Sequence, residues 1–298
     1  MQRAAKLLVA FLACAILVSA NVADAAPGAA NQDILWSSRL NGLPLFWLMN
    51  GQTYQTWRYL DNMSWSSIHT NNQIAGVGDF NQDGNQDILW RLGNSLPAVW
   101  YMNGRTYVSW QYVQDLPWPF IVNTSVVNGI ADFTHDGSPD VLWRVASNGL
   151  PVIWRMNHQS YVTWQVVDRM PWSSISTVNF SIGGAADFNQ DGNQDILWRN
   201  RINGLPVVWL MNGHTYITWK TLNGLQWSSI SSIFSIDGVA DMNKDGNQDI
   251  LWRNNNNGLP VLWLMNQMTY VTWQVPYNLP VSSVSTLFQI KGVGAFGN

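Results

Sequence analysis

The sequence predicts an all-β chain built from five copies of one four-stranded unit. The string Gln-Asp-Ile-Leu-Trp, or the variant Pro-Asp-Val-Leu-Trp, recurs five times, and its tryptophans are 53 to 55 residues apart: Trp36, Trp90, Trp143, Trp198 and Trp252. Each copy contains four short segments rich in β-branched and aromatic residues. The two chain ends each match half of a copy. Four antiparallel strands in a repeat of this length describe a blade of a β-propeller.

The fourth copy illustrates the expected strands. Residues 182–188 are small and apolar, as suits a position where backbones approach closely. Residues 195–199, 205–211 and 215–220 alternate in the manner of strands. Asn212-Gly213 lies between the last two and is a strong hairpin signal, because both residues tolerate positive φ. No segment shows a sustained helical period, so each copy is expected to be one four-stranded sheet.

The chain ends predict a closed ring of five blades. Residues 292–297 resemble residues 76–81, which form the first strand of a copy, and residues 31–36 match the segment after that strand in the other copies. The last strand can therefore pair with the first. Such pairing removes open sheet edges, which an exposed array would have to protect.

The first 25 residues have the features of a signal peptide. Arg3 and Lys6 precede an apolar run that ends at Val18, and Ala23-Asp24-Ala25 supplies small residues for cleavage after Ala25. The apolar run is too short to span a membrane, and no later stretch approaches the necessary length. We expect residues 26–298 to form the mature propeller, secreted to the extracellular space or the periplasm. Removal of the leader also removes the one cysteine, Cys14.

Composition argues against several functional classes. All 18 acidic residues are Asp, and the net charge is -3. A chain with this balance lacks the basic stripe that nucleic acid binding usually requires. The four His residues occupy non-equivalent repeat positions, and nearly every Asp is used by one repeated loop, so no paired carboxylates or Ser/His/Asp set can be nominated. The sequence therefore favours a protein that is not an enzyme.

The repeated loop between the first and second strands has metal-ligand spacing. Oxygen donors stand at loop positions one, three, five and nine with Gly at six, which suits Ca²⁺ because this cation prefers six to eight oxygen ligands. The predicted ligands are Asp79, Asn81, Asp83 and Asp87; Asp187, Asn189, Asp191 and Asp195; Asp241, Asn243, Asp245 and Asp249; and, in a looser fourth loop, Asp132, Thr134, Asp136 and Asp140. We expect three to four structural Ca²⁺ sites.

Two other interpretations fit parts of this loop. The loop begins like an EF-hand, but position twelve is Trp and the following segment is a strand. A metal-free turn is also conceivable, because Asp, Asn and Gly favour turns, although converging carboxylates without a cation repel one another. The fifth copy has Ala295 and Gly297 at ligand positions and is expected to hold no metal.

These motifs resemble a known repeat. Asp-Phe-Asn-x-Asp-Gly-x-x-Asp, then Ile-Leu-Trp-Arg, then an aliphatic-Trp-x-Met-Asn-Gly hairpin, is similar to the FG-GAP or VCBS repeat of integrin α-chain propellers and secreted propeller lectins. The resemblance covers the chain after the leader. It implies Ca²⁺ loops on one face and partner binding on the other. Integrin propellers and many such lectins have seven blades, so five blades are a departure.

A sugar-binding site is predicted on the face away from the metal loops. A Trp plate beside guanidinium donors suits a sugar, which has apolar C–H faces and a rim of hydroxyls. The predicted ligand-binding residues are the loop tryptophans Trp65, Trp118, Trp172 and Trp227, and the arginines that end the second strands, Arg91, Arg144, Arg199 and Arg253. The alternative is that these side chains only pack on one another. Val281 replaces the loop Trp in the fifth copy.

The strand tryptophans are expected to fill space between adjacent sheets. In the fourth copy these are Trp198, Trp209 and Trp219. Repetition gives several equal sites, which suits multivalent binding. The sequence thus predicts a secreted, Ca²⁺-stabilised lectin that binds glycans or glycoconjugates. The alternatives are a protein-binding adhesion or scaffold propeller and, less favoured, a polysaccharide hydrolase or lyase.

Overall fold

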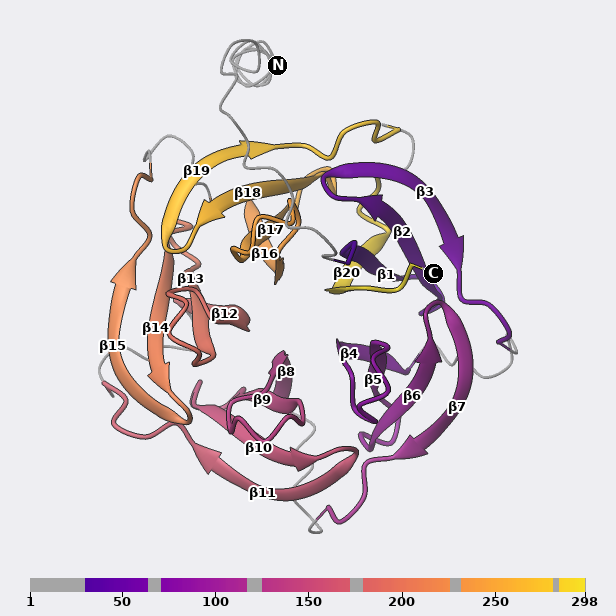
Figure 1. Ribbon diagram of the computed structural model, residues 1–298, viewed down its shortest axis with the longest axis horizontal. Coiled ribbons are helices and arrows are strands. Elements are labelled where there is room, and N and C mark those ends of the chain that lie inside the picture. Colours follow the sequence, from indigo (N-terminus) through magenta and orange to yellow (C-terminus); the bar gives the residue numbers. More distant parts are fainter. Residues whose placement is uncertain are drawn as a thin grey trace.

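A computed structural model describes residues 30–63, 71–116, 125–171, 179–225, 232–280 and 284–297. These residues form five four-stranded antiparallel sheets arranged as blades around a central axis (Figure 1). The fold is therefore the predicted five-bladed β-propeller. The expected leader, residues 1–25, lies outside the described residues.

The blades are numbered from the N-terminus, and each is given from its inner to its outer strand. Blade 1 consists of β20 (Phe288–Gly294), β1 (Asp33–Ser38), β2 (Pro44–Asn50) and β3 (Thr53–Tyr59). Blade 2 consists of β4 (Gln73–Gly78), β5 (Asp87–Arg91), β6 (Pro97–Asn103) and β7 (Thr106–Tyr112). Blade 3 consists of β8 (Ser125–Ala131), β9 (Asp140–Val145), β10 (Pro151–Asn157) and β11 (Ser160–Val166).

Blades 4 and 5 continue the same order. Blade 4 consists of β12 (Phe180–Ala186), β13 (Asp195–Asn200), β14 (Pro206–Asn212) and β15 (Thr215–Thr221). Blade 5 consists of β16 (Phe234–Ala240), β17 (Asp249–Asn254), β18 (Pro260–Asn266) and β19 (Thr269–Gln274). Within the described ranges every regular element is a strand, and none offers an apolar helix long enough to cross a bilayer.

The ring closes through β20, as predicted. This C-terminal strand pairs antiparallel with β1, from Asp33 opposite Gly294 to Ser38 opposite Phe288. The Phe296 ring then packs against Phe46, with centroids 4.6 Å apart. Blade 1 therefore joins the two ends of the described chain.

The third-to-fourth strand hairpin differs from the predicted turn. Asn212 pairs with Thr215, so Asn212 ends β14 and the turn residues are Gly213 and His214. Only Gly213 has positive φ, at 56°. A Gly at the first of the two turn positions is typical of a type II′ turn. The hairpin was therefore predicted correctly, but its two turn residues were placed one position early.

The core lies between neighbouring blades. Trp198 and Trp209 of blade 4 pack with Leu142 and Ile153 of blade 3, and the equivalent residues repeat this arrangement around the ring. In each blade the two indoles are tilted, with ring centroids 4.5 to 4.7 Å apart. The inter-sheet packing predicted for these two tryptophans is confirmed.

The inner strands approach closely around the axis. A Cβ added at Gly76 would lie 2.7 Å from Ile130 Cδ1 on the next inner strand, so no larger residue fits there without movement. Each inner strand carries a register shift that leaves one extra residue. These bulge residues are Ala75, Asn128, Gly183, Asp237 and Lys291. The inner strands enclose a central cavity of about 320 Å³.

A second contact joins the blades at the periphery. A residue two or three positions after the end of each outermost strand forms an isolated parallel bridge with the start of the next outermost strand, for example Asp168 with Thr215. The Asp168 amide donates to His214 O, and the Tyr216 amide donates to Asp168 O, both at 3.0 Å. The same bridge joins Tyr277 of blade 5 to Thr53 of blade 1. The ring is thus closed at its outer rim as well as within blade 1.

Candidate functional site

The repeated Asp/Asn/Gly loops lie together on one face, between the first and second strands of blades 2 to 5. In blade 2, Asp79 accepts the amides of Asp83 (3.1 Å) and Gly84 (2.8 Å). Asn81 Oδ1 also accepts the Asp83 amide, and Asn81 Nδ2 donates to Asp83 Oδ2 at 2.8 Å. Loop positions one, three and five therefore converge around one tight turn. Gly84, at position six, has φ of 89°, which favours Gly.

The position-nine aspartate has a different role. Asp87 is fully buried; its Oδ1 accepts the Met102 amide and its Oδ2 accepts the Phe80 amide, both at 3.0 Å. Burial raises the pKa of Asp87 to about 7; the two backbone hydrogen bonds oppose this, whereas the nearby Asp83 and Asp79 carboxylates add to it. This carboxylate connects the loop to the third strand through its bonds to Phe80 and Met102. The negative charges of Asp79 and Asp83 repel it.

The same arrangement recurs in the other loops. Burial is the main cause that raises the pKa of Asp195 to about 7, of Asp249 to about 8 and of Asp140 to about 6. In each, neighbouring loop carboxylates contribute in the same direction. In blade 3 the Thr134 amide donates to Asp140 Oδ2 at 3.1 Å. The blade 3 loop forms the same turn as the other loops: the Asp136 amide donates to Asp132 Oδ1 at 3.2 Å.

The donor set fits Ca²⁺ in chemistry. Three carboxylates and one amide or hydroxyl oxygen per loop are hard oxygen ligands. A cation would offset the repulsion between loop carboxylates that adds to the effect of burial on the position-nine pKa values. Among the described residues, no three acidic, His or Cys side chains are grouped closely enough to make a metal cluster by themselves. A bound cation would therefore need the side-chain oxygens that now accept loop amides at positions one, three and five.

Side chains at loop position four connect neighbouring loops. Gln82 Nε2 donates to Gly137 O of the next loop at 2.8 Å, and Gln190 Nε2 donates to Gly246 O at 3.1 Å. His135 Nε2 lies 2.8 Å from Gly192 O. These contacts link the loops of blades 2 to 5 in series. Sequence reasoning missed them, although the position-four residues are long polar side chains.

The predicted sugar-binding arginines lie mainly between blades. Arg144, Arg199 and Arg253 are buried, and Arg91 is partly buried. Arg144 Nη1 donates to Phe180 O of the next blade at 2.5 Å, and its guanidinium lies 5.4 Å from the centroid of the Trp198 ring. Arg253 likewise donates to Phe288 O of β20 and lies 5.9 Å from the Trp36 ring. Arg199 Nη2 donates to Ser232 O at 3.0 Å. Packing between blades thus accounts for these three arginines.

The predicted loop tryptophans, Trp65, Trp118, Trp172 and Trp227, lie outside the described residues, as does Val281. In the loops of blades 2, 4 and 5 the side chains at positions one, three and five gather around one backbone turn, whereas the position-nine aspartate is buried against backbone amides.

A different set of tryptophans is exposed. Trp219, expected between sheets, is 54 % exposed on the outermost strand of blade 4. Its equivalents are Trp57 (44 %), Trp110 (47 %), Trp164 (41 %) and the partly buried Trp273. The expectation for Trp219 was wrong because each indole stands directly opposite a buried Trp of the third strand, but at the rim, where the next sheet no longer covers it.

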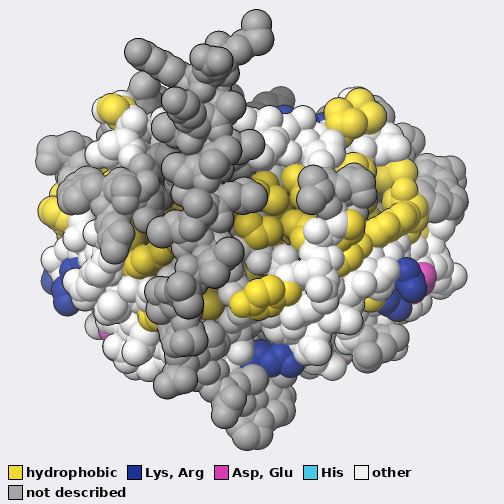
Figure 2. Space-filling model, turned by 90° about the horizontal axis from the view of Figure 1, so that it is seen from above, with side chains coloured by type: hydrophobic (Ala, Val, Ile, Leu, Met, Phe, Trp, Pro, Cys, Tyr) yellow, Lys and Arg dark blue, Asp and Glu magenta, His cyan; other side chains and the backbone are white. Residues whose placement is uncertain are grey.

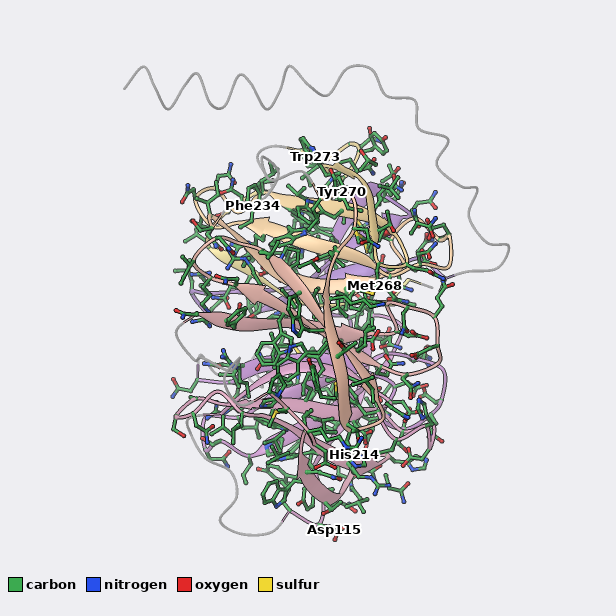
Figure 3. All side chains as sticks on the ribbon, turned by 90° about the vertical axis from the view of Figure 1, so that its left-hand side faces the viewer. Asp115, His214, Phe234, Met268, Tyr270 and Trp273 are labelled. Atoms are coloured by element: carbon green, nitrogen blue, oxygen red, sulfur yellow. The ribbon has the colours of Figure 1, made fainter. Side chains whose placement is uncertain are left out.

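We call these five residues the outer-wall tryptophans. Figure 2 looks onto the wall formed by β19 and β3 and shows hydrophobic side chains gathered across it, with few charged ones among them. Figure 3 shows Trp273 and Tyr270 on β19 at the periphery of the ring. In blades 1 and 2 a tyrosine lies edge-on to the indole: Tyr59 is 5.1 Å from Trp57, and Tyr112 is 5.0 Å from Trp110.

The family comparison agrees with the repeat pattern. Residues 187–252, which run from the blade 4 loop to the second strand of blade 5, match the family described as FG-GAP-like repeat. This segment is therefore similar to an FG-GAP-like repeat. The matched segment begins and ends within the repeated motif, and blades 2 and 3 repeat its strands and loop. No curated protein sequence matches the chain.

Several solved structures are similar at low identity. A chain of the Photorhabdus luminescens Tc holotoxin pore is 14% identical with a TM-score of 0.46, over 83% of this chain and 12% of that one. A chain of a nidogen/laminin complex is 11% identical with a TM-score of 0.47, over 88% and 97%. AofleA from Arthrobotrys oligospora is 10% identical with a TM-score of 0.47, over 84% and 70%. This chain therefore spans about an eighth of the holotoxin chain.

Proposed function

We propose that this protein is a secreted, Ca²⁺-stabilised lectin that binds glycans at several equivalent places on one molecule. The observation that carries the proposal is the repetition of an exposed indole on the outermost strands, with four outer-wall tryptophans at least 41 % exposed. Exposed tryptophan is costly to leave in water, and its flat apolar face matches the C–H face of a sugar ring. The exposed tyrosines Tyr59 and Tyr112, which lie edge-on to Trp57 and Trp110, supply hydroxyl groups that can bond to a sugar.

Repetition also explains why binding is proposed and catalysis is not. Each outer-wall site is shallow and wet, so one site alone is expected to bind a sugar with Kd in the millimolar to micromolar range, about -4 to -8 kcal/mol. Several such sites on one rigid ring bind a glycan-coated surface much more tightly than a free sugar. Single-site catalysis gains nothing from this arrangement.

Calcium has a supporting role in the proposal. The ligands are those of the four loops of blades 2 to 5, and the cation would neutralise the acids of each loop. Because position-four side chains link successive loops, ordering one loop also restrains the next. Calcium is thus proposed to stabilise the ring that presents the tryptophans rather than to contact the sugar.

The test is binding to a glycan array and to glycan-coated beads, with and without chelator. Trp110→Ala with Trp219→Ala should weaken bead binding by at least about tenfold, because multivalent binding falls steeply as sites are lost. The melting temperature should stay near that of the parent, since these indoles are about half exposed. Leu40→Ala, at an exposed residue outside the outer wall, is the control and should bind normally.

A second variant separates the two candidate positions of the site. Replacing Trp118, Trp172 and Trp227 together by Ala removes loop tryptophans and leaves the outer wall unchanged. If only this triple variant loses glycan binding and still folds, the ligand contacts the loops. If the parent binds no glycan on the array, the lectin proposal fails.

A protein-binding adhesion function is the second candidate, and one observation favours it. Two residues before the outer-wall Trp, four blades expose an aliphatic side chain: Val108 (58 %), Val162 (55 %), Ile217 (54 %) and Val271 (51 %). Aliphatic groups add to a protein interface more than to a sugar site. Val108→Thr with Ile217→Thr should weaken capture of a protein partner and leave sugar binding unchanged.

A further inference from the structure

One boundary between blades contains a pocket with excess positive charge. The blade 3–4 pocket has a volume of about 250 Å³ and is lined by residues that include Val126, Asn128, Arg144, Val145, Ser181 and Arg201. It lies where the second strands end, on the face away from the Ca²⁺ loops, because β9 and β13 start at the loop aspartates and run toward it. It is separate from the outer-wall tryptophans.

Two guanidinium groups meet at this pocket. Burial lowers the pKa of Arg144, and the neighbouring charge of Arg201 lowers that pKa further. Arg144 donates hydrogen bonds to the neutral carbonyls of Gly149 and Phe180. Among the described residues, Arg201 forms no salt bridge with a carboxylate. An anion in the pocket would relieve the repulsion and gain charge-assisted hydrogen bonds.

The boundary between blades 5 and 1 provides a natural comparison. There the equivalent arginines are Arg253 and Arg39, and the bulge residue is Asp237 in place of Asn128. Burial lowers the pKa of Arg253, and the Asp237 carboxylate opposes that shift. Burial raises the pKa of Asp237, and the charges of Arg253, Lys291 and Arg39 oppose it. That boundary contains its own counter-ion. The blade 3–4 pocket has the same pair of arginines with an uncharged amide at the bulge.

Asn128 adds a second unsatisfied group. Its Oδ1 is buried and has no hydrogen-bond partner among the described residues. A buried acceptor without a partner carries a desolvation cost, which a ligand hydroxyl would remove by donating to it. Ser181 contributes a further hydroxyl to the lining. The pocket thus offers cationic donors for an anionic oxygen group and an acceptor for a hydroxyl group. Its volume of about 250 Å³ suits a ligand of the size of one monosaccharide.

We propose that the blade 3–4 pocket binds an acidic sugar, with the sugar carboxylate between Arg144 and Arg201 and a sugar hydroxyl donating to Asn128 Oδ1. In the sequence, the blade 3–4 boundary alone combines these two arginine positions with an uncharged bulge residue, so each chain takes one such ligand. This site is independent of the repeated outer-wall sites, and its failure leaves the lectin proposal untouched.

The experiment is a titration of the full mature chain with glucuronate. Glucose is the control that lacks the carboxylate, and acetate and sulfate are the controls that have a negative charge but no sugar ring. Binding is followed by calorimetry and by ligand-observed NMR. Glucuronate should bind at least about tenfold more tightly than glucose, because only glucuronate gains the charge-assisted bonds. Acetate and sulfate should bind at least about tenfold more weakly than glucuronate, because they lack the hydroxyl donor.

Variants locate the site. Arg201→Ala should abolish the preference for glucuronate over glucose; Arg201 is solvent-exposed, and an unchanged melt verifies that the variant folds. Asn128→Asp should do the same, because it installs the carboxylate that the blade 5–1 boundary already has. Asn255→Ala, at the position equivalent to Arg201 in blade 5, is the control and should bind glucuronate like the parent.

Three results would overturn the proposal. Glucuronate could bind no better than glucose. Acetate or sulfate could bind as tightly as glucuronate, which would remove the sugar from the assignment. Folded Arg201→Ala and Asn128→Asp proteins could also retain the full glucuronate preference, which would place the binding elsewhere.

Discussion

Blade 1 and blade 4 have the same four strands but differ in the loop that joins the first strand to the second. In blade 4, Asp195 Oδ1 accepts the Met211 amide at 3.0 Å and Oδ2 accepts the Phe188 amide at 3.1 Å. In blade 1, Asp33 accepts the Met49 amide at 2.8 Å and the Phe296 amide at 3.2 Å, although the loop is split between the chain ends. The position-nine Asp therefore serves the fold with or without a complete loop.

The two blades differ at the other ligand positions. Blade 4 has Asp187 and Asn189 at positions one and three, where blade 1 has Ala295 and Gly297. Blade 1 still forms all of its strand pairings. The acid at position one and the polar side chain at position three are therefore dispensable for the sheet. We propose that their repetition in blades 2 to 5 serves to bind a cation.

The largest expected effect comes from opening blade 1. A chain that ends at residue 287 lacks β20, so β1 becomes an exposed inner edge and Phe46 loses its contact with Phe296. Cooperative unfolding should be lost, and the protein should aggregate. Circular dichroism melts and gel filtration measure both. Removal of residues 297–298 alone is the control; a chain lacking 288–298 that stays monomeric and melts like the parent contradicts closure through blade 1.

Chelation should have the next largest effect, and it should act on blades 2 to 5 only. A ligand bound by the native state alone stabilises it by about 2.7 kcal/mol per site at 100 times Kd. Excess EDTA should therefore lower the melting temperature clearly, and added Ca²⁺ should restore it. If the melt is unchanged and metal analysis finds none bound before chelation, the Ca²⁺ assignment is wrong.

A pair of substitutions separates the structural role of position nine from its metal role. Asp33→Ala and Asp195→Ala each leave two buried amides without an acceptor, at a cost of roughly 1–3 kcal/mol per amide. The loss for Asp33→Ala should be the same with Ca²⁺ and with EDTA. The loss for Asp195→Ala should be larger with Ca²⁺, because the variant then also lacks the stabilisation that a bound ion gives the parent. Denaturant melts of both variants in both conditions provide the measurement, and equal calcium dependence would refute the contrast.

The smallest effect concerns pH in the presence of chelator. The pKa values of Asp87 and Asp195 are raised to about 7 and that of Asp249 to about 8 in the folded protein, above the ordinary value of 3.8. The folded state then binds more protons than the unfolded state, so these groups contribute stability at low pH that is lost as pH rises through the folded pKa. The melting temperature of the chelated protein should fall from about pH 5 to about pH 8. Saturating Ca²⁺ should flatten this decline, and a rise with pH in EDTA would contradict it.

Sequence periodicity was sufficient for the architecture. The spacing of Trp36 and its equivalents predicted five blades, and the match of residues 292–297 to residues 76–81 predicted the closing strand. Both signals follow from the repeat of about 54 residues alone and require no knowledge of contacts between blades. The turns of the repeated Asp/Asn/Gly loops were predictable for a related reason, since the residues of each turn lie within nine consecutive positions.

Contacts between neighbouring blades could not be predicted from the repeat pattern. Arg144 lies on the predicted face, but it donates a hydrogen bond to Phe180 O in the next blade. That partner is distant in the sequence, so no local pattern indicates it. Trp209 and Trp219 stand opposite each other in adjacent strands, yet one is 4 % exposed and the other 54 %. Only the radial position in the ring separates them. The bulge residues, such as Asn128 and Asp237, likewise gain their neighbours only when the inner strands surround one cavity.

The contrast between the closing blade and the four continuous blades is tested most directly by counting bound calcium. Equilibrium dialysis followed by metal analysis should find one Ca²⁺ in each loop of blades 2 to 5 and none in blade 1. Asp187→Ala with Asp191→Ala should then remove the ion of blade 4 alone. A parent chain that binds no calcium, or a variant that keeps the parental count, would contradict the account.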